Sequence, residues 1–185
     1  MENKLMMKLV IGTEAILFIC IMITYVYFAL SVGFTTQANH YLDIKITGIY
    51  SILLFVSSFT LIQAEKNYAK GEVRKLKTWL GTTILLGGIF LFGQLKEYAK
   101  LLTKNFGISL NIFSTNFFTL TGLHAFHVII GLILLTIMLV LALLGDFDRP
   151  NSTILSSIGM YWHFVDIVWI LVFTLVYVVP YLSIF

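Results

Sequence analysis

The chain has 185 residues, of which 59% are hydrophobic and 11% charged, and its formal net charge is +3. Soluble domains carry about a quarter charged residues, so this composition excludes a soluble globular protein and indicates an integral membrane protein. The single cysteine, Cys20, excludes intrachain disulfides, thiolate zinc sites, cysteine-ligated iron–sulfur clusters and a CxxCH haem attachment. The basic residues form no dense patch of the kind that would indicate a nucleic-acid partner. We expect one transmembrane domain over residues 1–185.

The hydropathy pattern predicts an all-α bundle of five transmembrane helices, because each crossing needs about 20 apolar residues. The amino-terminal stretch resembles a signal peptide, with Lys4 and Lys8 before an apolar run. However, this run contains Glu14, lacks a small-residue cleavage pattern and is long enough to span, so we interpret it as an uncleaved first helix. The predicted helices cover residues 8–30, 44–65, 77–98, 114–143 and 153–182.

Polar connectors separate the predicted helices. They run from Gly33 to His40, from Glu65 to Lys77, from Glu97 to Gly107, and from Gly145 to Ser152. The amino terminus and the second and fourth connectors together hold eight lysine and arginine residues, against four in the first and third connectors and the adjoining helix ends. Positive residues gather on the cytoplasmic side of membrane proteins, which predicts a cytoplasmic amino terminus and an outside carboxyl terminus.

Glycines punctuate the third and fourth predicted helices. Small residues let neighbouring membrane helices approach closely, so we expect these positions to lie at helix contacts. They are Gly81, Gly87, Gly88, Gly93, Gly122 and Gly131.

Ionisable residues in the last two helices stand at the i, i+3 spacing, His124 with His127 and His163 with Asp166. Counted at about 1.5 Å per residue, all four approach the middle of the membrane, where such side chains need partners. We therefore expect the two helix faces to meet, with these four residues forming one polar network. Glu14, about two turns into the first helix, must be protonated, paired or solvated by a cavity.

A second polar group, Gln94, Lys96 and Glu97, lies near the end of the third predicted helix. Long polar side chains at such positions reach the membrane interface, and we expect interfacial anchors here. The aromatic residues Tyr161 and Trp162 are expected to make packing or lipid contacts rather than to cage a cofactor.

Three readings of the intramembrane polar set stay open from the residues alone. Two histidines on different helices could ligate a haem iron, and three histidines with an aspartate could hold copper, zinc or iron. Glu14 and the mid-membrane residues could instead relay protons. The third reading is a buried hydrogen-bonded network that fixes the helices against each other.

Two segments closely resemble subunit III of the haem–copper terminal oxidases, namely Asn116–Gly131 and Tyr161–Trp169. The resemblance extends to Thr13–Ala15, similar to a Ser-Glu-Val segment of the family, and to Gly93–Tyr98, similar to its Gln-x-x-Glu-Tyr segment. It covers nearly the whole chain and is weakest around the second helix.

The resemblance implies a subunit without a catalytic, cofactor-binding or metal-binding residue, in a proton-pumping respiratory oxidase that reduces O2 to water. The haems and copper would lie in the partner subunit I, with subunit II as a further partner. The chain would stabilise subunit I, support proton uptake and hold structural phospholipids in a bacterial cytoplasmic membrane. Residues assigned to the polar interior of the family by this likeness are Glu14, His127, His163 and Asp166.

One departure from the family is that its long form has seven helices, and this chain begins where the third would stand. Short five-helix forms occur in cytochrome c and quinol oxidases and in a relative associated with nitric oxide reductase. The electron donor is left open, as are two alternatives: that nitric-oxide-reductase-associated protein, and a small membrane cytochrome of the b type.

Overall fold

The structure is a computed structural model that describes residues 2–34, 38, 40–145 and 153–182. Every long element in these residues is helical, and they contain no strand. Five helical spans are long and apolar enough to cross a membrane, which confirms the predicted all-α architecture. In chain order the elements are α1 (Glu2–Phe28), the π-helical turn η1 (Ala29–Gly33), α3 (Ile44–Ala69), α4 (Val73–Thr103), α5 (Ile112–Leu144), α6 (Thr153–Phe173), the π-helical turn η2 (Thr174–Val178) and α7 (Val179–Tyr181).

The helical spans cover the predicted ones, except that the last ends at Tyr181 instead of residue 182, and most extend beyond them. For example, α4 starts four residues before the predicted residue 77 and ends five residues after residue 98. Hydropathy marks only the part of a helix that fits the hydrocarbon, whereas the helix itself continues into its polar ends. The fourth predicted connector lies outside the described residues except for Gly145, and so does part of the first. The membrane orientation and the single-domain assignment stay predictions.

Local sequence signals set several helix ends. Asp43 caps α3, since its carboxylate accepts hydrogen bonds from the backbone N–H groups of Lys45 and Ile46. Asn111 and Ser114 form a reciprocal capping box at the start of α5. Gly145 ends α5 with a φ of 91°, a left-handed conformation that glycine adopts without a steric penalty. These caps satisfy backbone groups that a helix end otherwise leaves unpaired.

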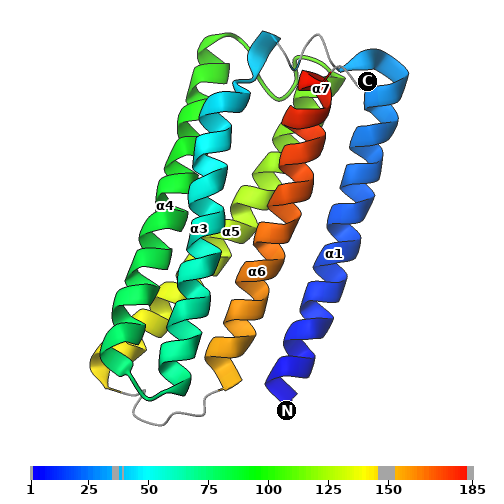
Figure 1. Ribbon diagram of the computed structural model, residues 1–185. Coiled ribbons are helices and arrows are strands. Elements are labelled where there is room, and N and C mark those ends of the chain that lie inside the picture. The colour runs from blue at the N-terminus through cyan, green and yellow to red at the C-terminus, as the bar shows by residue number, and fades with distance from the viewer. Residues whose placement is uncertain (1, 35–37, 39, 146–152, 183–185) are drawn as a thin grey trace.

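The helices lie roughly along one common axis, and the chain termini lie at opposite ends of the bundle (Figure 1). α3 packs most extensively against α4, and α4 packs in turn against α5. α6 contacts α1, α3 and α5, so it is the helix on which the two sides of the bundle meet. The main contacts of α1 with other long helices are with α5 and α6. The last two helices therefore carry the candidate residues into the centre of the bundle.

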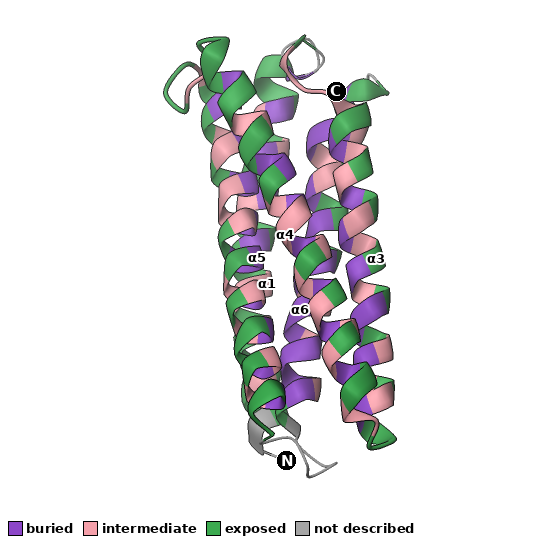
Figure 2. Ribbon diagram, turned by 90° about the vertical axis from the view of Figure 1, so that its left-hand side faces the viewer, coloured by how far each residue is buried: buried purple, intermediate pink, exposed green. Residues whose placement is uncertain are grey.

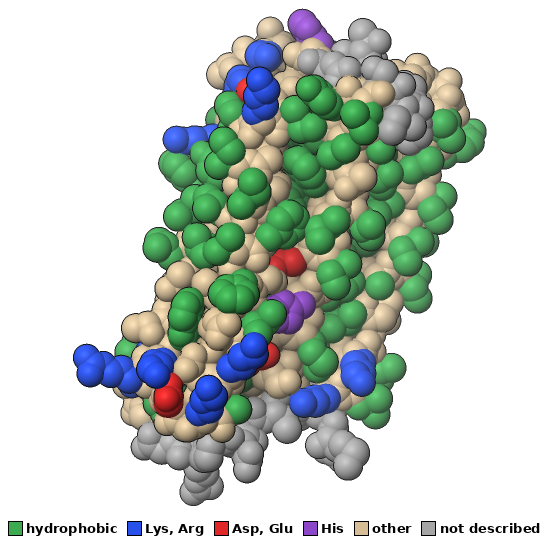
Figure 3. Space-filling view, in the orientation of Figure 1, with side chains coloured by type: hydrophobic (Ala, Val, Ile, Leu, Met, Phe, Trp, Pro, Cys, Tyr) green, Lys and Arg blue, Asp and Glu red, His purple; other side chains and the backbone are tan. Residues whose placement is uncertain are grey.

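The outside of the bundle is apolar. Buried residues face inward along each helix and exposed ones face outward (Figure 2), and large hydrophobic side chains such as Ile16, Leu85 and Phe126 are more than half exposed. On the face shown in Figure 3, hydrophobic side chains cover the middle, and lysine and arginine side chains gather toward the ends. Such a surface is stable in a membrane rather than in water, and its charges lie where headgroups and water begin.

Candidate functional site

The first candidate site joins α1 to α5 through Glu14 and His127. His127 Nε2 lies 3.0 Å from Glu14 Oε2, and His127 Nδ1 lies 2.8 Å from the carbonyl oxygen of Leu123. A carbonyl oxygen only accepts, so Nδ1 carries a hydrogen and donates to Leu123. The bond between Nε2 and Glu14 then needs one further proton, which is held either by the carboxyl group or by the imidazole. The two side chains share one exchangeable proton.

This pair lies against a lateral cavity of about 420 Å³ that is lined mainly by apolar side chains of α1 and α5. The side chain of Glu14 is 29% exposed toward it, whereas that of His127 is 6% exposed. The ring of Phe18 packs edge-on against the imidazole, and Tyr161 of α6 donates to the carbonyl oxygen of His127 at 3.3 Å. The histidine is held in place by three helices, while the carboxyl group faces the cavity.

The second group joins α6 to α3 through Ser58. The Ser58 hydroxyl donates to Asp166 Oδ2 and lies 2.9 Å from His163 Nδ1. A hydroxyl has only one hydrogen, so Ser58 accepts from His163 Nδ1–H when it donates to Asp166. The other carboxylate oxygen, Asp166 Oδ1, is buried and has no hydrogen-bond partner in the part of the chain that the structure describes. Gly159, one turn before His163 on α6, leaves space for the carboxyl group of Glu65.

His124 stands apart from both groups. It is fully buried, and neither ring nitrogen has a hydrogen-bond partner among the described residues. Its ring stacks on Trp169 with 4.7 Å between ring centroids, and the edge of Phe90 packs nearby. Burying a polar ring without a hydrogen-bond partner costs free energy. Among the described residues, only packing against the aromatic rings offsets this cost for His124.

The predicted single network of His124, His127, His163 and Asp166 is therefore wrong. Residues three apart on a helix point about 60° away from each other, because each residue turns the helix by about 100°. His127 consequently reaches α1, whereas His124 faces Trp169 on α6. His163 and Asp166 turn to α3 rather than to α5. The four residues do lie in the interior or at its edge, as expected, but they divide into three groups.

The expected interfacial anchors are mostly internal. Gln94 is 4% exposed, and Glu97 accepts hydrogen bonds from Thr47 at 3.1 Å and from Tyr177 at 3.0 Å. Helix packing at the start of α3 encloses these side chains before they can reach the interface. Lys96 is exposed and lies over the ring of Phe92, as an anchor does. For Lys96 the anchoring role stays a prediction, whereas it is wrong for Gln94 and Glu97, whose polar groups lie inside the bundle.

Of the two kinds of contact expected for Tyr161 and Trp162, packing is confirmed and lipid contact is wrong. Tyr161 and Trp162 are 5% and 0% exposed, so they make internal packing contacts. The indole of Trp162 fits between Gly87 of α4 and Gly131 of α5, and its N–H donates to Ser57 at 3.1 Å. Gly87 and Gly131 therefore make room for the indole ring of Trp162 rather than for the backbone of a second helix.

The hydroxyl side chains of α3 are the functional partners that the sequence reasoning missed. Trp169 donates to Ser51 at 2.8 Å, much as Trp162 donates to Ser57, and Thr60 lies 2.7 Å from Thr83 of α4. Thr47, Ser51 and Ser58 follow one another at intervals of four and seven residues in an apolar stretch. This periodicity is the signal that could have identified α3 as the helix that satisfies the polar groups of α6.

Asp166→Ala is expected to loosen the chain more than Asp166→Asn. Alanine leaves Ser58 without its buried acceptor, at a cost of about 1–3 kcal/mol, whereas asparagine keeps a carbonyl oxygen for the same bond. The measurement is retention of the chain in its complex as detergent concentration is raised. Ser58→Ala serves as the partner in a double-mutant cycle, and additive effects of Ser58→Ala and Asp166→Ala would contradict the contact.

Among the described residues, no three histidine, cysteine, aspartate or glutamate side chains lie together as a metal site. The expectation that this chain holds no haem or metal stays a prediction.

Comparisons with known proteins place these residues in a family context. Residues 2–181 match the family described as cytochrome c oxidase subunit III. The chain is 32% identical to the cytochrome bo(3) ubiquinol oxidase subunit 3 of Pseudomonas aeruginosa, covering 89% of this chain and 79% of that protein. It is 32% identical to the cytochrome c oxidase subunit 3 of Synechocystis, over 89% and 70% of the two chains. It is 30% identical to the same subunit of Bacillus sp. PS3, over 91% and 82%.

Proposed function

The chain belongs to the cytochrome c oxidase subunit III family. From this premise we propose that it protects a catalytic partner subunit from inactivation and supplies it with protons, without carrying out chemistry itself. It is a multi-pass membrane subunit III of a respiratory terminal oxidase and part of a multi-subunit complex. The proposal is that it stabilises subunit I and supports proton uptake while the complex reduces O2 to water and pumps protons.

The observation that carries the proposal is the hydrogen bond between Glu14 and His127. The imidazole is fixed by Leu123 and Tyr161, so it keeps one ring nitrogen toward the carboxyl group. The carboxyl group lies partly open in the lateral cavity. Such a pair can pass a proton on if it takes up a second proton from one side and then releases one on another, which returns it to its starting state. The structural contacts around it also join α1 to the rest of the bundle.

The partners in this proposal are subunit I, with the haems and copper, and subunit II, together with structural phospholipids in a bacterial cytoplasmic membrane. The named relatives above are all subunits of oxidases, which favours an oxidase over a nitric-oxide-reductase-associated protein or a b-type cytochrome. Their names include both a ubiquinol oxidase and cytochrome c oxidases, so the electron donor stays open.

Removal of this chain from the purified complex is expected to leave the initial rate of oxygen reduction largely intact and to shorten the active lifetime. Without proton supply, the catalytic subunit should inactivate during turnover, most rapidly at high pH where protons are scarce. Oxygen consumption followed over time at several pH values measures both quantities.

Rebinding of the chain is the control and should restore the lifetime. Immediate loss of activity on removal would contradict the proposal by indicating a catalytic role. An unchanged lifetime would reduce the chain to a passive scaffold.

A further inference from the structure

A basic hollow lies at the end of the bundle where α3 begins and α4 ends. It has a volume of about 580 Å³, and three lysines line it against a single described acidic residue, Asp43. The space-filling view shows lysine or arginine side chains at this end, above a surface of hydrophobic ones (Figure 3). Residues of the basic hollow that matter here are Lys45, Lys100, Lys104, Asp43, Tyr177 and Tyr181.

Asp43, which supplies the one described carboxylate in the hollow, is already engaged. Asp43 accepts from the backbone N–H groups of Lys45 and Ile46 at 3.2 and 3.3 Å, and it lies 3.9 Å from Lys100 Nζ. It therefore occupies the amino terminus of α3 and offsets one lysine in part. Lys45 and Lys104 form no ion pair within the described part of the chain. The hollow keeps an excess of positive charge, which favours an anionic ligand.

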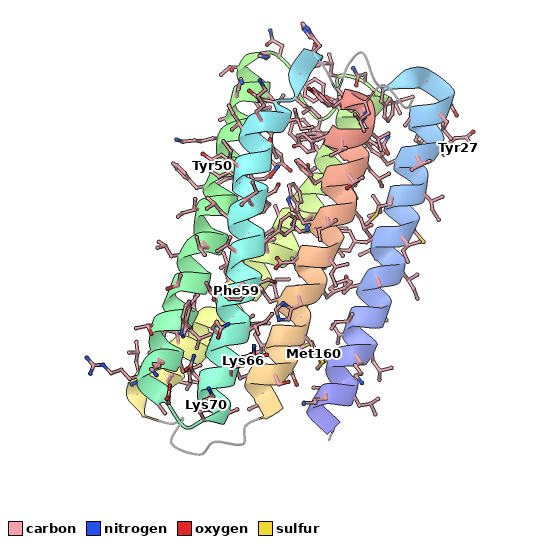
Figure 4. The ribbon with its side chains drawn as sticks, in the orientation of Figure 1. Tyr27, Tyr50, Phe59, Lys66, Lys70 and Met160 are labelled. Carbon is pink, nitrogen blue, oxygen red and sulfur yellow. The ribbon has the colours of Figure 1, made fainter. Side chains whose placement is uncertain are left out.

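A second cavity of about 230 Å³ adjoins the hollow and shares Asp43 and Lys100 with it. It extends along the α3–α4 contact into the membrane-spanning part. Ile46, Tyr50 and Leu101 line it there, together with the polar side chains of Thr47, Gln94, Lys96 and Glu97. Tyr50 lies in the half of α3 toward the end of the bundle where the chain has its carboxyl terminus, and Lys66 and Lys70 lie toward the opposite end (Figure 4). The side chain of Ile46 is 49% exposed. A charged hollow that continues into a mainly apolar groove matches a molecule with a charged head and an apolar tail.

We propose that the basic hollow binds the phosphate headgroup of an anionic phospholipid, and that an acyl chain of this lipid follows the groove between α3 and α4. Lysines at a membrane surface attract anionic headgroups, and an exposed tyrosine such as Tyr181 suits the interface between headgroups and hydrocarbon. The inference deepens the structural-phospholipid part of the proposed function by giving it a place and a lipid class. A soluble anion would use the lysines but not the apolar groove.

The test uses the whole oxidase complex in membranes with spin-labelled phosphatidylglycerol or spin-labelled phosphatidylcholine as the probe. Electron paramagnetic resonance gives the fraction of each lipid that the protein holds. One variant carries Lys45→Gln, Lys100→Gln and Lys104→Gln. The matched control removes three lysines from the other end, with Lys66→Gln, Lys70→Gln and Lys77→Gln.

The unmodified complex is expected to prefer phosphatidylglycerol, and the control is expected to keep this preference. Each lysine near a membrane surface contributes about a five-fold preference, so the triple variant in the basic hollow should lose on the order of a hundred-fold at this site. Ile46→Ser, which keeps every lysine, should weaken lipid binding as well. The single variant Lys104→Gln repeats the test with one exposed side chain, so that a folding defect of the triple variant does not decide the result.

An unchanged preference in the variants of the hollow would overturn the proposal. So would displacement of the lipid by inorganic phosphate alone, since that result would indicate a site for soluble anions. Loss of another subunit from the triple variant, without a change in lipid preference, would indicate a site for an acidic protein surface instead. None of these measurements depends on turnover, so their failure would leave the proposed role in proton uptake untouched.

Discussion

Substitution of Gly87 or Gly131 by alanine is expected to displace Trp162 and to loosen the bundle, whereas Gly88→Ala is expected to leave it intact. An alanine Cβ at position 131 would lie 2.7 Å from Trp162 Cε3, and one at position 87 would lie 2.8 Å from Trp162 Cη2. An alanine Cβ at position 88 would meet no atom within 4 Å. Gly87 and Gly88 are neighbours on one helix, so they gain helix propensity equally and differ only in the clash.

The indole of Trp162 cannot move away cheaply. It is fully buried, two helices confine its ring, and its N–H is bonded to Ser57. Overpacking such a site costs about 1–3 kcal/mol, and breaking the hydrogen bond would leave a buried donor unpaired at a similar cost. The Gly87→Ala/Gly131→Ala double variant should therefore show the largest loss.

The resistance of the isolated chain to denaturing detergent measures this effect, and tryptophan fluorescence reports the displacement of the ring. Trp162→Phe in the Gly131→Ala background serves as a rescue, because the smaller ring frees space beside the new methyl group. Equal destabilisation by Gly87→Ala and Gly88→Ala would show that the slot for Trp162 is not the cause.

The second large effect is expected at the Glu14–His127 pair, where stability and proton supply can be separated. Glu14→Leu or His127→Leu leaves the other polar group without its partner, at about 1–3 kcal/mol, and should weaken retention of the chain in the complex. The Glu14→Leu/His127→Leu double variant should recover most of that retention, because replacing both partners by apolar groups is nearly neutral. Its active lifetime during turnover should nevertheless stay short.

Glu14→Gln provides the complementary case. The amide can donate to His127 Nε2, so it keeps the contact, but it cannot ionise or exchange a proton in the same way. This variant should be retained fully and still shorten the lifetime in part. Thr13→Val is the matched control, since among the described residues the Thr13 hydroxyl bonds only to the Val10 carbonyl of its own helix turn.

Retention and turnover lifetime must be measured on the same preparations. If lifetime recovers together with retention in the double variant, the pair is a structural contact and not part of a proton supply. A full lifetime in Glu14→Gln would lead to the same conclusion.

The pairing of polar side chains shows why sequence reasoning reached the right residues with the wrong partners. His127 and Asp166 were identified because ionisable groups in an apolar run need partners. The run itself does not state which neighbouring helix supplies them. Glu14 lies 113 residues from His127 in the chain, and Ser58 lies 108 residues from Asp166. A small rotation of one helix about its axis would change either partner.

The sequence by itself determined the five membrane-spanning helices and the family. Each transmembrane helix satisfies its backbone hydrogen bonds internally, so its existence follows from local length and hydropathy. The family follows from Asn116–Gly131 and Tyr161–Trp169, which are contiguous segments. Only the tertiary structure decided that Trp162 fills the space left by Gly87 and Gly131, and that His124 and His127 serve different neighbours. The physical reason is that helix rotation and relative height set these contacts, and they depend on the packing of all five helices at once.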